Sequence, residues 1–198
     1  MTETRADIPG AGVEAELLRG ARGPYRVADY MELPEDGPRF QLMRGWLVRE
    51  PSPTERHQRA IGNLYVLLRR WVGARRLGTV YLAPFDVVLS DQDVVQPDIL
   101  FVSADRRSVV TPKNVQGAPD LVVEVLSPGT DRRDRVVKLR IYAEARVREA
   151  WVVDPWAETL EVVALQEEGS GTTYRGDERP RSAVLGEPDF SVAEIFAE

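Results

Sequence analysis

The sequence contains no cysteine and only one histidine among its 198 residues. The lack of cysteine excludes disulfides, thiolate metal sites, iron–sulfur clusters and cysteine nucleophiles. The single histidine, His57, makes a histidine-rich zinc site untenable and leaves a Ser-His-Asp triad with one possible base. Any metal chemistry must therefore use oxygen ligands, which favours Mg²⁺, Mn²⁺ or Ca²⁺.

Long apolar runs and lysine are also scarce. No run of about 18 apolar residues occurs, and residues 1–23 lack the apolar core of a signal peptide, so we expect a cytoplasmic protein with no membrane partner. The net charge of −6 argues against indiscriminate coating of nucleic acid, so any polyanion site must be local. All but two of the 26 basic residues are arginine, and the exceptions are Lys113 and Lys138.

The composition, 43% hydrophobic and 29% charged, suits one domain, which we place over residues 26–198 behind a flexible leader over residues 1–25. A helix is predicted over 53–72, with Ser52 as N-cap, Pro53 at the first helical position and Gly73 at its end. The other predicted elements are helices over 27–33 and 130–145, a hairpin over 39–50, strands over 79–89, 94–102, 120–126, 150–153 and 159–165, and a docked tail over 190–196. This order predicts an α/β or α+β fold with one central mixed sheet flanked by helices.

Two carboxylates interrupt apolar strands. Asp98 lies in a row with Leu100 and Val102, and Glu124 lies in the middle of a strand that is apolar on both faces. An unpaired carboxylate there would be costly. On neighbouring strands and facing the same way, the two would stand roughly 5 Å apart, a spacing that holds one divalent ion and without a cation forces one acid to take up a proton.

A lysine occupies an equally unexpected place. At about 100° per residue, Lys138 falls at the centre of the apolar stripe of helix 130–145. The short connection after residue 126 brings that helix close to the strand of Glu124. A buried ammonium needs nearby anions, and the candidates are Asp98, Glu124 and Asp134.

Two carboxylates and a lysine suit phosphodiester hydrolysis. The carboxylates, a phosphate oxygen and waters can complete the oxygen shell of Mg²⁺, which lowers the pKa of a bound water. The lysine can position or deprotonate the nucleophile and stabilise the transition state.

The same residues resemble a known family. The segments that carry the resemblance are Gln96-Pro97-Asp98, residues 118–128, Asp134 to Lys138 with Tyr142, and residues 149–155. Over roughly residues 26–196 they are similar to the Uma family of restriction endonucleases, a branch of the PD-(D/E)XK nuclease superfamily. The resemblance implies a mixed sheet flanked by helices, with the acids at an opened edge of the sheet.

By this resemblance Asp98 and Glu124 match the two acids of the motif and would bind Mg²⁺ or Mn²⁺. Leu126 stands where the motif has its lysine, and Lys138 replaces it from the following helix. Gln41 stands where relatives carry an acid, so it is a supporting ligand that brings no charge. A DNA substrate is implied, with Arg132, Arg133 and Arg135 as the expected DNA contacts.

Cutting two strands suggests a homodimer, with candidate interface anchors at Trp46, Trp151 and Trp156. Other readings stay open at this point. Asp98 and Glu124 could form a buried structural pair, and Lys138 an i, i+4 ion pair with Asp134. The chain could then be a catalytically inactive nucleic-acid-binding module or a protein-interaction module that keeps the fold. Asp86, His57 and Ser127 are expected to serve structure rather than chemistry.

Overall fold

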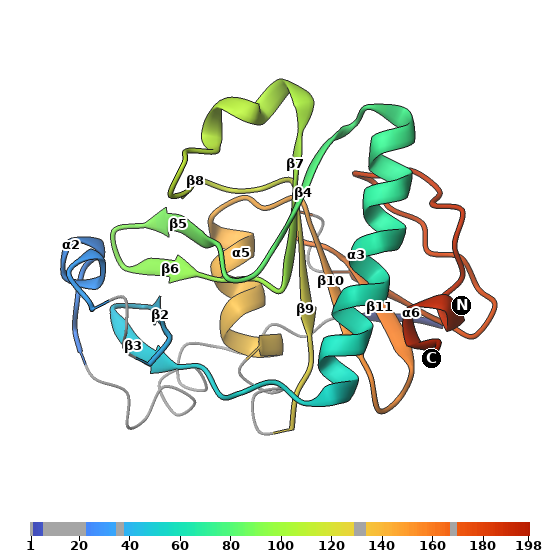
Figure 1. The fold of residues 1–198 in the computed structure, drawn as a ribbon, viewed down its shortest axis with the longest axis horizontal. Helices are drawn as coiled ribbons and strands as arrows, with labels where there is room; N and C mark the ends of the chain where they lie inside the picture. Colours follow the sequence, from blue (N-terminus) through green and yellow to red (C-terminus); the bar gives the residue numbers. More distant parts are fainter. Residues whose placement is uncertain (1, 6–22, 35–37, 129–133, 167–169) are drawn as a thin grey trace.

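The computed structural model describes residues 2–5, 23–34, 38–128, 134–166 and 170–198. It shows two mixed β-sheets flanked by helices (Figure 1). The larger sheet has seven strands in the order β1-β12-β11-β10-β9-β7-β4, and only β9 and β10 are parallel neighbours. Its strands are β1 (Thr2–Arg5), β4 (Gly78–Leu82), β7 (Ile99–Ser103), β9 (Leu121–Val125), β10 (Glu149–Asp154), β11 (Thr159–Ala164) and β12 (Ser170–Arg175).

The smaller sheet has five strands in the order β3-β2-β6-β5-β8. Its strands are β2 (Phe40–Met43), β3 (Trp46–Arg49), β5 (Asp86–Ser90), β6 (Asp93–Val95) and β8 (Asn114–Gln116). The predicted hairpin over 39–50 is confirmed as β2 and β3, which turn at Arg44 and Gly45, both with positive φ.

The predicted α+β fold of mixed sheet flanked by helices is confirmed, but its strands are divided between two sheets instead of forming one. The segments 79–89 and 94–102 are each divided between the two sheets, at residues 83–85 and 96–98. Each division contains a proline, Pro84 or Pro97, and proline has no N–H to donate to a sheet ladder. The chain therefore leaves the smaller sheet at Gln96 and enters the larger one after Asp98.

Helix α3 (Glu55–Arg75) packs on one face of the larger sheet. The buried side of α3 belongs to the core that contains Ile99 and Val123, and its residues there include Leu64, Leu68 and Trp71. Its limits differ from the predicted 53–72. The helix begins two residues later, because the Thr54 hydroxyl accepts a bond from His57 N at 3.3 Å, so Thr54 and not Ser52 is the N-cap.

The C-terminal limit of α3 also lies beyond the prediction. Gly73 does not end the helix, which continues to Arg75. The left-handed residue that ends it is Arg76, with φ of 54°.

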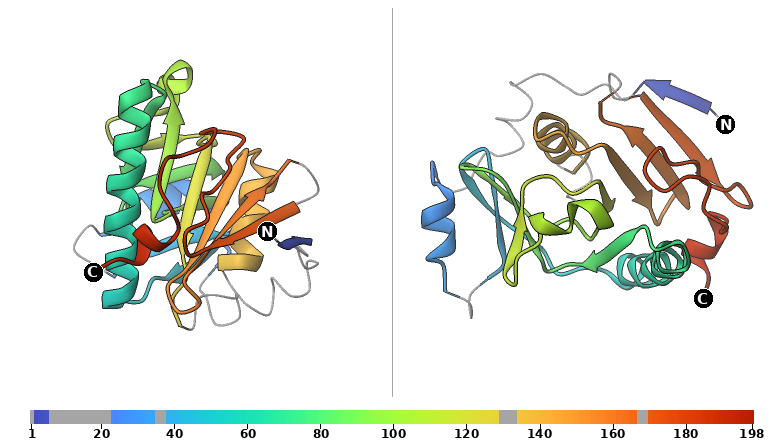
Figure 2. Two further views of the ribbon diagram at one scale, coloured as in Figure 1. Left: turned by 90° about the vertical axis from the view of Figure 1, so that its right-hand side faces the viewer. Right: turned by 90° about the horizontal axis from the view of Figure 1, so that it is seen from above.

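The opposite face of the larger sheet is covered by η2 (Asp134–Lys138) and α5 (Leu139–Glu144), as the two views of Figure 2 show. Ile141 and Tyr142 belong to a second core with Leu100 and Val122. The predicted helix over 130–145 is confirmed from residue 134 onward in a form that starts as a π-helical turn, and its first residues lie outside the described part.

The remaining elements are α2 (Val27–Met31), the 3₁₀ helix η1 (Ala104–Val109) and α6 (Ala193–Phe196). Within the predicted leader, Thr2–Arg5 form β1, which pairs with β12, and Tyr25 N donates to Gly45 O at 2.6 Å, whereas residues 6–22 lie outside the described part. The predicted docking of the tail is confirmed by the burial of Phe190 and Ile195 in the α3 core. Across the described residues, none of the helices combines the length and the apolar character needed to cross a membrane.

Candidate active site

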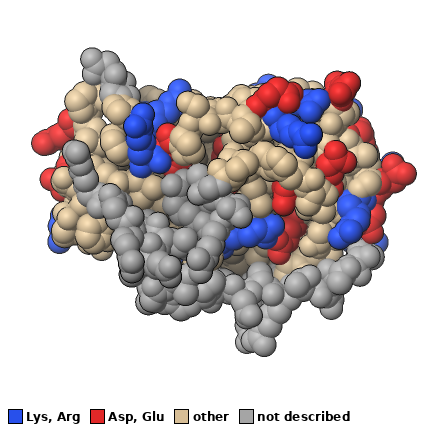
Figure 3. Space-filling view, turned by 90° about the horizontal axis from the view of Figure 1, so that it is seen from below, with Lys and Arg blue, Asp and Glu red and all other residues tan. Residues whose placement is uncertain are grey.

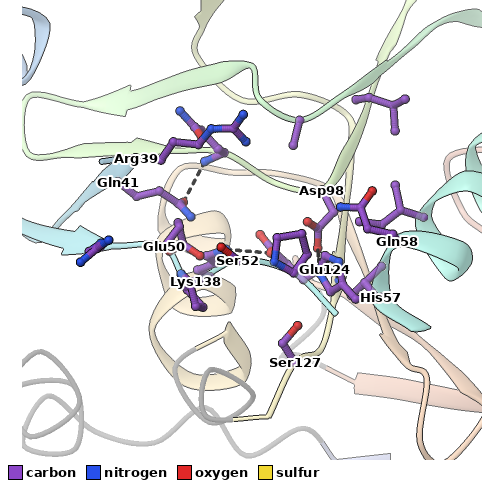
Figure 4. Close-up of a pocket in the computed structure, with 18 of the residues that line it drawn as sticks. Arg39, Gln41, Glu50, Ser52, His57, Gln58, Asp98, Glu124, Ser127 and Lys138 are labelled. Atoms are coloured by element: carbon purple, nitrogen blue, oxygen red, sulfur yellow. Dashed lines mark hydrogen bonds and ion pairs between the residues drawn. The ribbon is translucent and has the colours of Figure 1, made fainter. Parts of the chain in front are cut away.

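The sequence-predicted residues Gln41, Asp98, Glu124 and Lys138 line one cleft of about 630 Å³ (Figure 4). One wall is the β2–β3 hairpin, and the segment from Glu50 to Pro53 runs from this hairpin to α3. The other wall is the first turn of α3 with the ends of β4 and β9. The cleft thus lies where the two sheets meet, next to the proline-containing crossing at residues 96–98.

Asp98 occupies the wall of the cleft just before β7. The pairing of Ile99 with Val123 places Asp98 opposite Glu124 in the antiparallel register. Its Oδ2 accepts a bond from Val125 N at 2.7 Å and lies 3.5 Å from His57 Nε2. The side chain is 18% exposed, so the carboxylate is fixed by the sheet but reachable from the cleft.

Glu124 lies deeper, with 2% of its surface exposed. Its Oε2 accepts a bond from Lys138 Nζ at 2.8 Å, and its Oε1 accepts one from the Tyr142 hydroxyl at 2.5 Å. A buried carboxylate is stable only when such donors replace its lost hydration. The two donors fix the orientation of the carboxylate plane.

Lys138 comes from the crossover between the parallel strands β9 and β10. This crossover starts directly after the strand that bears Glu124, so the helix returns across the sheet next to that residue. The side chain of Lys138 is 4% exposed, in agreement with its predicted place on the apolar stripe. The ammonium is therefore paired with Glu124. The side chain of Asp134, the alternative partner, lies outside the described part.

Gln41 is buried on β2, and its Oε1 accepts a bond from Gln96 N at 2.8 Å. The Gln96 side chain in turn donates to Asp86 Oδ1, which also accepts from the Tyr30 hydroxyl at 3.0 Å. Burial, reinforced by Asp86, raises the pKa of Tyr30, so this hydroxyl remains a neutral donor. Asp86 therefore has a structural role, as expected, and it supports the strand segment that carries Gln41.

The expected DNA contacts lie elsewhere or outside the described part. Arg135 pairs with Glu161 on β11 at 2.5 Å, and it does not line the cleft. Arg132 and Arg133 fall among the residues that the structure does not describe. Among the expected dimer anchors, Trp151 is corrected to a core residue, because it is fully buried and donates to Glu149 at 2.8 Å.

Two side chains that contact the acids, Tyr142 and His57, were not assigned to the site from the sequence. Tyr142 lies one helical turn after Lys138, and its i, i+4 spacing could have revealed it as a second partner of Glu124. His57 was expected to be structural, yet it lies beside Asp98, and its buried Nδ1 has no hydrogen-bond partner among the described residues. Only the tertiary fold brings His57 to the acids.

The donor set fits a hard divalent cation. In the part of the chain that the structure describes, no three His, Cys, Asp or Glu side chains gather into a metal-binding group. Asp98 and Glu124 nevertheless present carboxylate oxygens from opposed strand positions to one cleft. Two carboxylates, completed by water and substrate oxygens, are a usual way to hold Mg²⁺.

Fold and sequence comparisons agree on the class of protein. A crystal structure of a putative nuclease belonging to DUF820 from Anabaena variabilis is similar, with a TM-score of 0.73 and 19% identity over 87% of this chain and 98% of that chain. This likeness shows that the two chains share a fold. Residues 27–193 match the Uma2 family, described as "Putative restriction endonuclease", so the chain belongs to that family. No curated protein matches the chain.

Proposed function

We propose that this protein is a divalent-metal-dependent endonuclease that hydrolyses phosphodiester bonds in DNA. Its family and fold support a nuclease. The observation that carries the proposal is the 2.8 Å contact of Lys138 Nζ with Glu124 Oε2, in a cleft that Asp98 also lines. Acids that can hold a metal ion, together with a cation that can stabilise the transition state, suit phosphodiester hydrolysis.

In this proposal Asp98 and Glu124 hold Mg²⁺ or Mn²⁺, and Gln41 is a possible supporting ligand. The bound ion would supply a water of lowered pKa and offset charge on the phosphate. Lys138 acts as catalytic base or transition-state stabiliser, because its amine is held at the acid that faces the cleft. Tyr142 fixes Glu124 from the other side. The Gln41 carbonyl already accepts from Gln96 N, so Gln41 would have to share or exchange this bond.

The finer partner assignments belong to the same proposal. Arg132, Arg133 and Arg135 remain predicted contacts to the DNA backbone, and the cytoplasm remains the predicted location. A homodimer would place two clefts on the two strands of a duplex. Trp156, which is 44% exposed, is the better remaining anchor for it. Sedimentation of the wild type beside Trp156→Ala would test the dimer.

Plasmid cleavage tests the proposed function. We expect nicking with Mn²⁺ or Mg²⁺ that EDTA abolishes, and a loss of at least about 100-fold in Glu124→Ala and Lys138→Ala. Lys113→Ala is the matched control, because Lys113 is exposed and is the other lysine of the chain. Equal nicking by the wild type and both site variants would indicate contamination and would remove the catalytic assignment.

A second candidate is a catalytically inactive nucleic-acid-binding or protein-interaction module. The neutral Gln41, whose Oε1 is already bonded to Gln96 N, favours it because the cleft then has one charge fewer for a metal. This candidate predicts salt-sensitive DNA binding that needs no divalent ion, or no DNA binding at all. Binding measured with Mg²⁺ and with EDTA separates it from the enzyme.

A further inference from the structure

Two arginines at the open end of the β2–β3 hairpin line the cleft, and neither has a side-chain partner among the described residues. Arg39 and Arg49 are exposed, and neither forms an ion pair or a side-chain hydrogen bond with a described residue. Many other arginines of this chain are paired with acids, including Arg44 with Glu144. Among the described residues that line this cleft, Arg39 and Arg49 are the arginines, and both guanidinium groups are therefore available to an external anion.

The other charges of the cleft do not neutralise these arginines. Lys138 is paired with Glu124, and Asp98 lies against His57. Glu50 is opposite Arg39 in the hairpin, where its backbone N donates to Arg39 O at 3.1 Å, but no ion pair joins the two side chains. A guanidinium presents a planar set of donors that matches a phosphate group, and it keeps its charge at every working pH.

The position of the arginines relates them to the acids. Arg39 and Gln41 lie on the hairpin side of the cleft, and Asp98 and His57 lie on the α3 side (Figure 4). Arg49 directly precedes the segment Glu50–Pro53, which runs from the hairpin to α3 along the cleft. If a DNA strand places one phosphate at Asp98 and Glu124, its neighbouring phosphates would therefore lie over the open end of the β2–β3 hairpin.

We propose that Arg39 and Arg49 bind backbone phosphates that flank the scissile phosphate of the DNA. This inference rests on the proposed function and names the surface through which the substrate enters it. On the described part of the face in Figure 3, Lys and Arg side chains are interspersed with Asp and Glu side chains.

Salt-dependent binding tests the inference. Fluorescence anisotropy of a labelled duplex is measured against KCl concentration with Ca²⁺ present, for Arg39→Gln, Arg49→Gln and the double variant. Each substitution should weaken binding several-fold and reduce the slope of log K against log salt by about one, and by about two in the double variant. In cleavage assays KM should rise while kcat changes little, because a uniform binding contact is lost.

Arg107→Gln is the matched control. Arg107 is exposed in η1, which follows the end of β7 opposite to Asp98, and its side chain donates only to Val110 O in the described part. Thermal unfolding should be unchanged in all variants, since both hairpin arginines are exposed.

The outcomes are distinct. Slopes equal to those of the wild type and Arg107→Gln would overturn the arginine assignment and leave the nuclease proposal intact. Reduced slopes in a protein that cleaves nothing would support the arginine assignment and remove the catalysis. A wild type that binds no DNA at low salt would overturn both.

Discussion

Glu124 shows how a charged residue is kept in an apolar sheet. With 2% exposure it has lost nearly all its water, and an isolated ionised carboxylate at such a place would be unstable. Lys138 supplies a compensating charge and Tyr142 supplies a neutral hydroxyl donor. Such a pair contributes little net stability but is costly to break. This cost favours a functional reason for retaining it.

The hydroxyl of Tyr142 gives the first prediction. Tyr142→Phe removes the donor to Glu124 Oε1 and leaves the ring in place, so we expect unfolding free energy to fall by about 1.5–3 kcal/mol. Denaturant unfolding measures this change, and nuclease activity should fall with it because Glu124 is less well oriented. Tyr65→Phe is the control, because Tyr65 is a partly buried tyrosine of α3 that lies at the edge of the core. An effect no larger than that of Tyr65→Phe would show that Lys138 alone holds Glu124.

The ion pair gives the second prediction. Lys138→Met should lower the unfolding free energy by about 3–5 kcal/mol, because Glu124 stays buried without its cation. Adding Glu124→Gln should restore part of this loss, which a double-mutant cycle measures as a coupling energy. Lys113→Met should be nearly neutral. Additive losses in the cycle would contradict a direct interaction between the two side chains.

The main site residues could be predicted because each broke a local pattern. Asp98, Glu124 and Lys138 are polar residues on apolar faces, and strand or helix periodicity reveals that without tertiary information. The proximity of His57 to Asp98 and the Gln96 bond to Gln41 could not be predicted, because these groups meet only where the two sheets adjoin. Arg39 and Arg49 looked like any other surface arginines of this arginine-rich sequence.

Among the elements, α3 positions one wall of the cleft through its first turn. The sequence pattern Ser52-Pro53-Thr54-Glu55 led to Ser52 as the predicted N-cap, because periodicity alone does not locate the first residue of a helix. The structure selects Thr54, which leaves Ser52 and Pro53 as part of the cleft lining and places His57 beside Asp98. A helix beginning two residues earlier would have covered this side of the cleft.

The choice of cap gives the third prediction. Thr54→Ala should lower the unfolding free energy by about 1 kcal/mol, because the N–H of His57 loses its acceptor. Ser52→Ala should change it by less than about 0.5 kcal/mol, since this residue lies outside the helix on the surface. Chemical denaturation of both variants measures the difference. The reverse order of effects would show that the helix starts at Ser52 in solution.

Sheet membership was the harder part of the fold to predict. Residues 94–102 read as one strand, because Val94, Leu100 and Val102 keep the alternation of apolar side chains through Pro97. Strand periodicity does not show when the chain changes sheets, and only the missing N–H of proline indicates a break. The break is functionally important, because it puts Gln96 and Asp98 into the cleft instead of a continuous ladder.

At the scale of the whole molecule, two buried carboxylates outside the cleft hold parts of the chain together. Asp120 accepts bonds from Ser103 N and from Arg106, each within about 3.0 Å. Burial acts to raise the pKa of Asp120, but these donors outweigh it and the pKa is lowered. Its stabilising effect is therefore present above the ordinary carboxylate range and is lost as pH falls through the lowered pKa.

The pKa of Glu149 is shifted in the opposite direction to that of Asp120, and this residue anchors the C-terminal segment. It accepts bonds from Ser182 Oγ at 2.5 Å and Ala183 N at 2.7 Å, and Ser182 Oγ accepts from Leu185 N. Burial raises the pKa of Glu149 above 4.5, and the hydrogen bonds offset the shift only in part. Between the ordinary carboxyl pKa and the raised pKa of Glu149, the folded state retains a proton that the unfolded state releases. The free energy of unfolding therefore decreases as pH rises between these two values.

The fourth prediction follows from the raised pKa of Glu149. Because a single proton is involved, the contribution of Glu149 to the pH dependence of unfolding free energy is at most about 1.4 kcal/mol per pH unit. Glu149→Gln cannot titrate, so its stability relative to the wild type should improve as pH rises above the ordinary carboxyl range. Urea unfolding across this range measures the trend, with the exposed Glu187→Gln as control. A difference between Glu149→Gln and the wild type that stays constant with pH would mean that Glu149 binds the C-terminal segment as an ordinary ionised carboxylate.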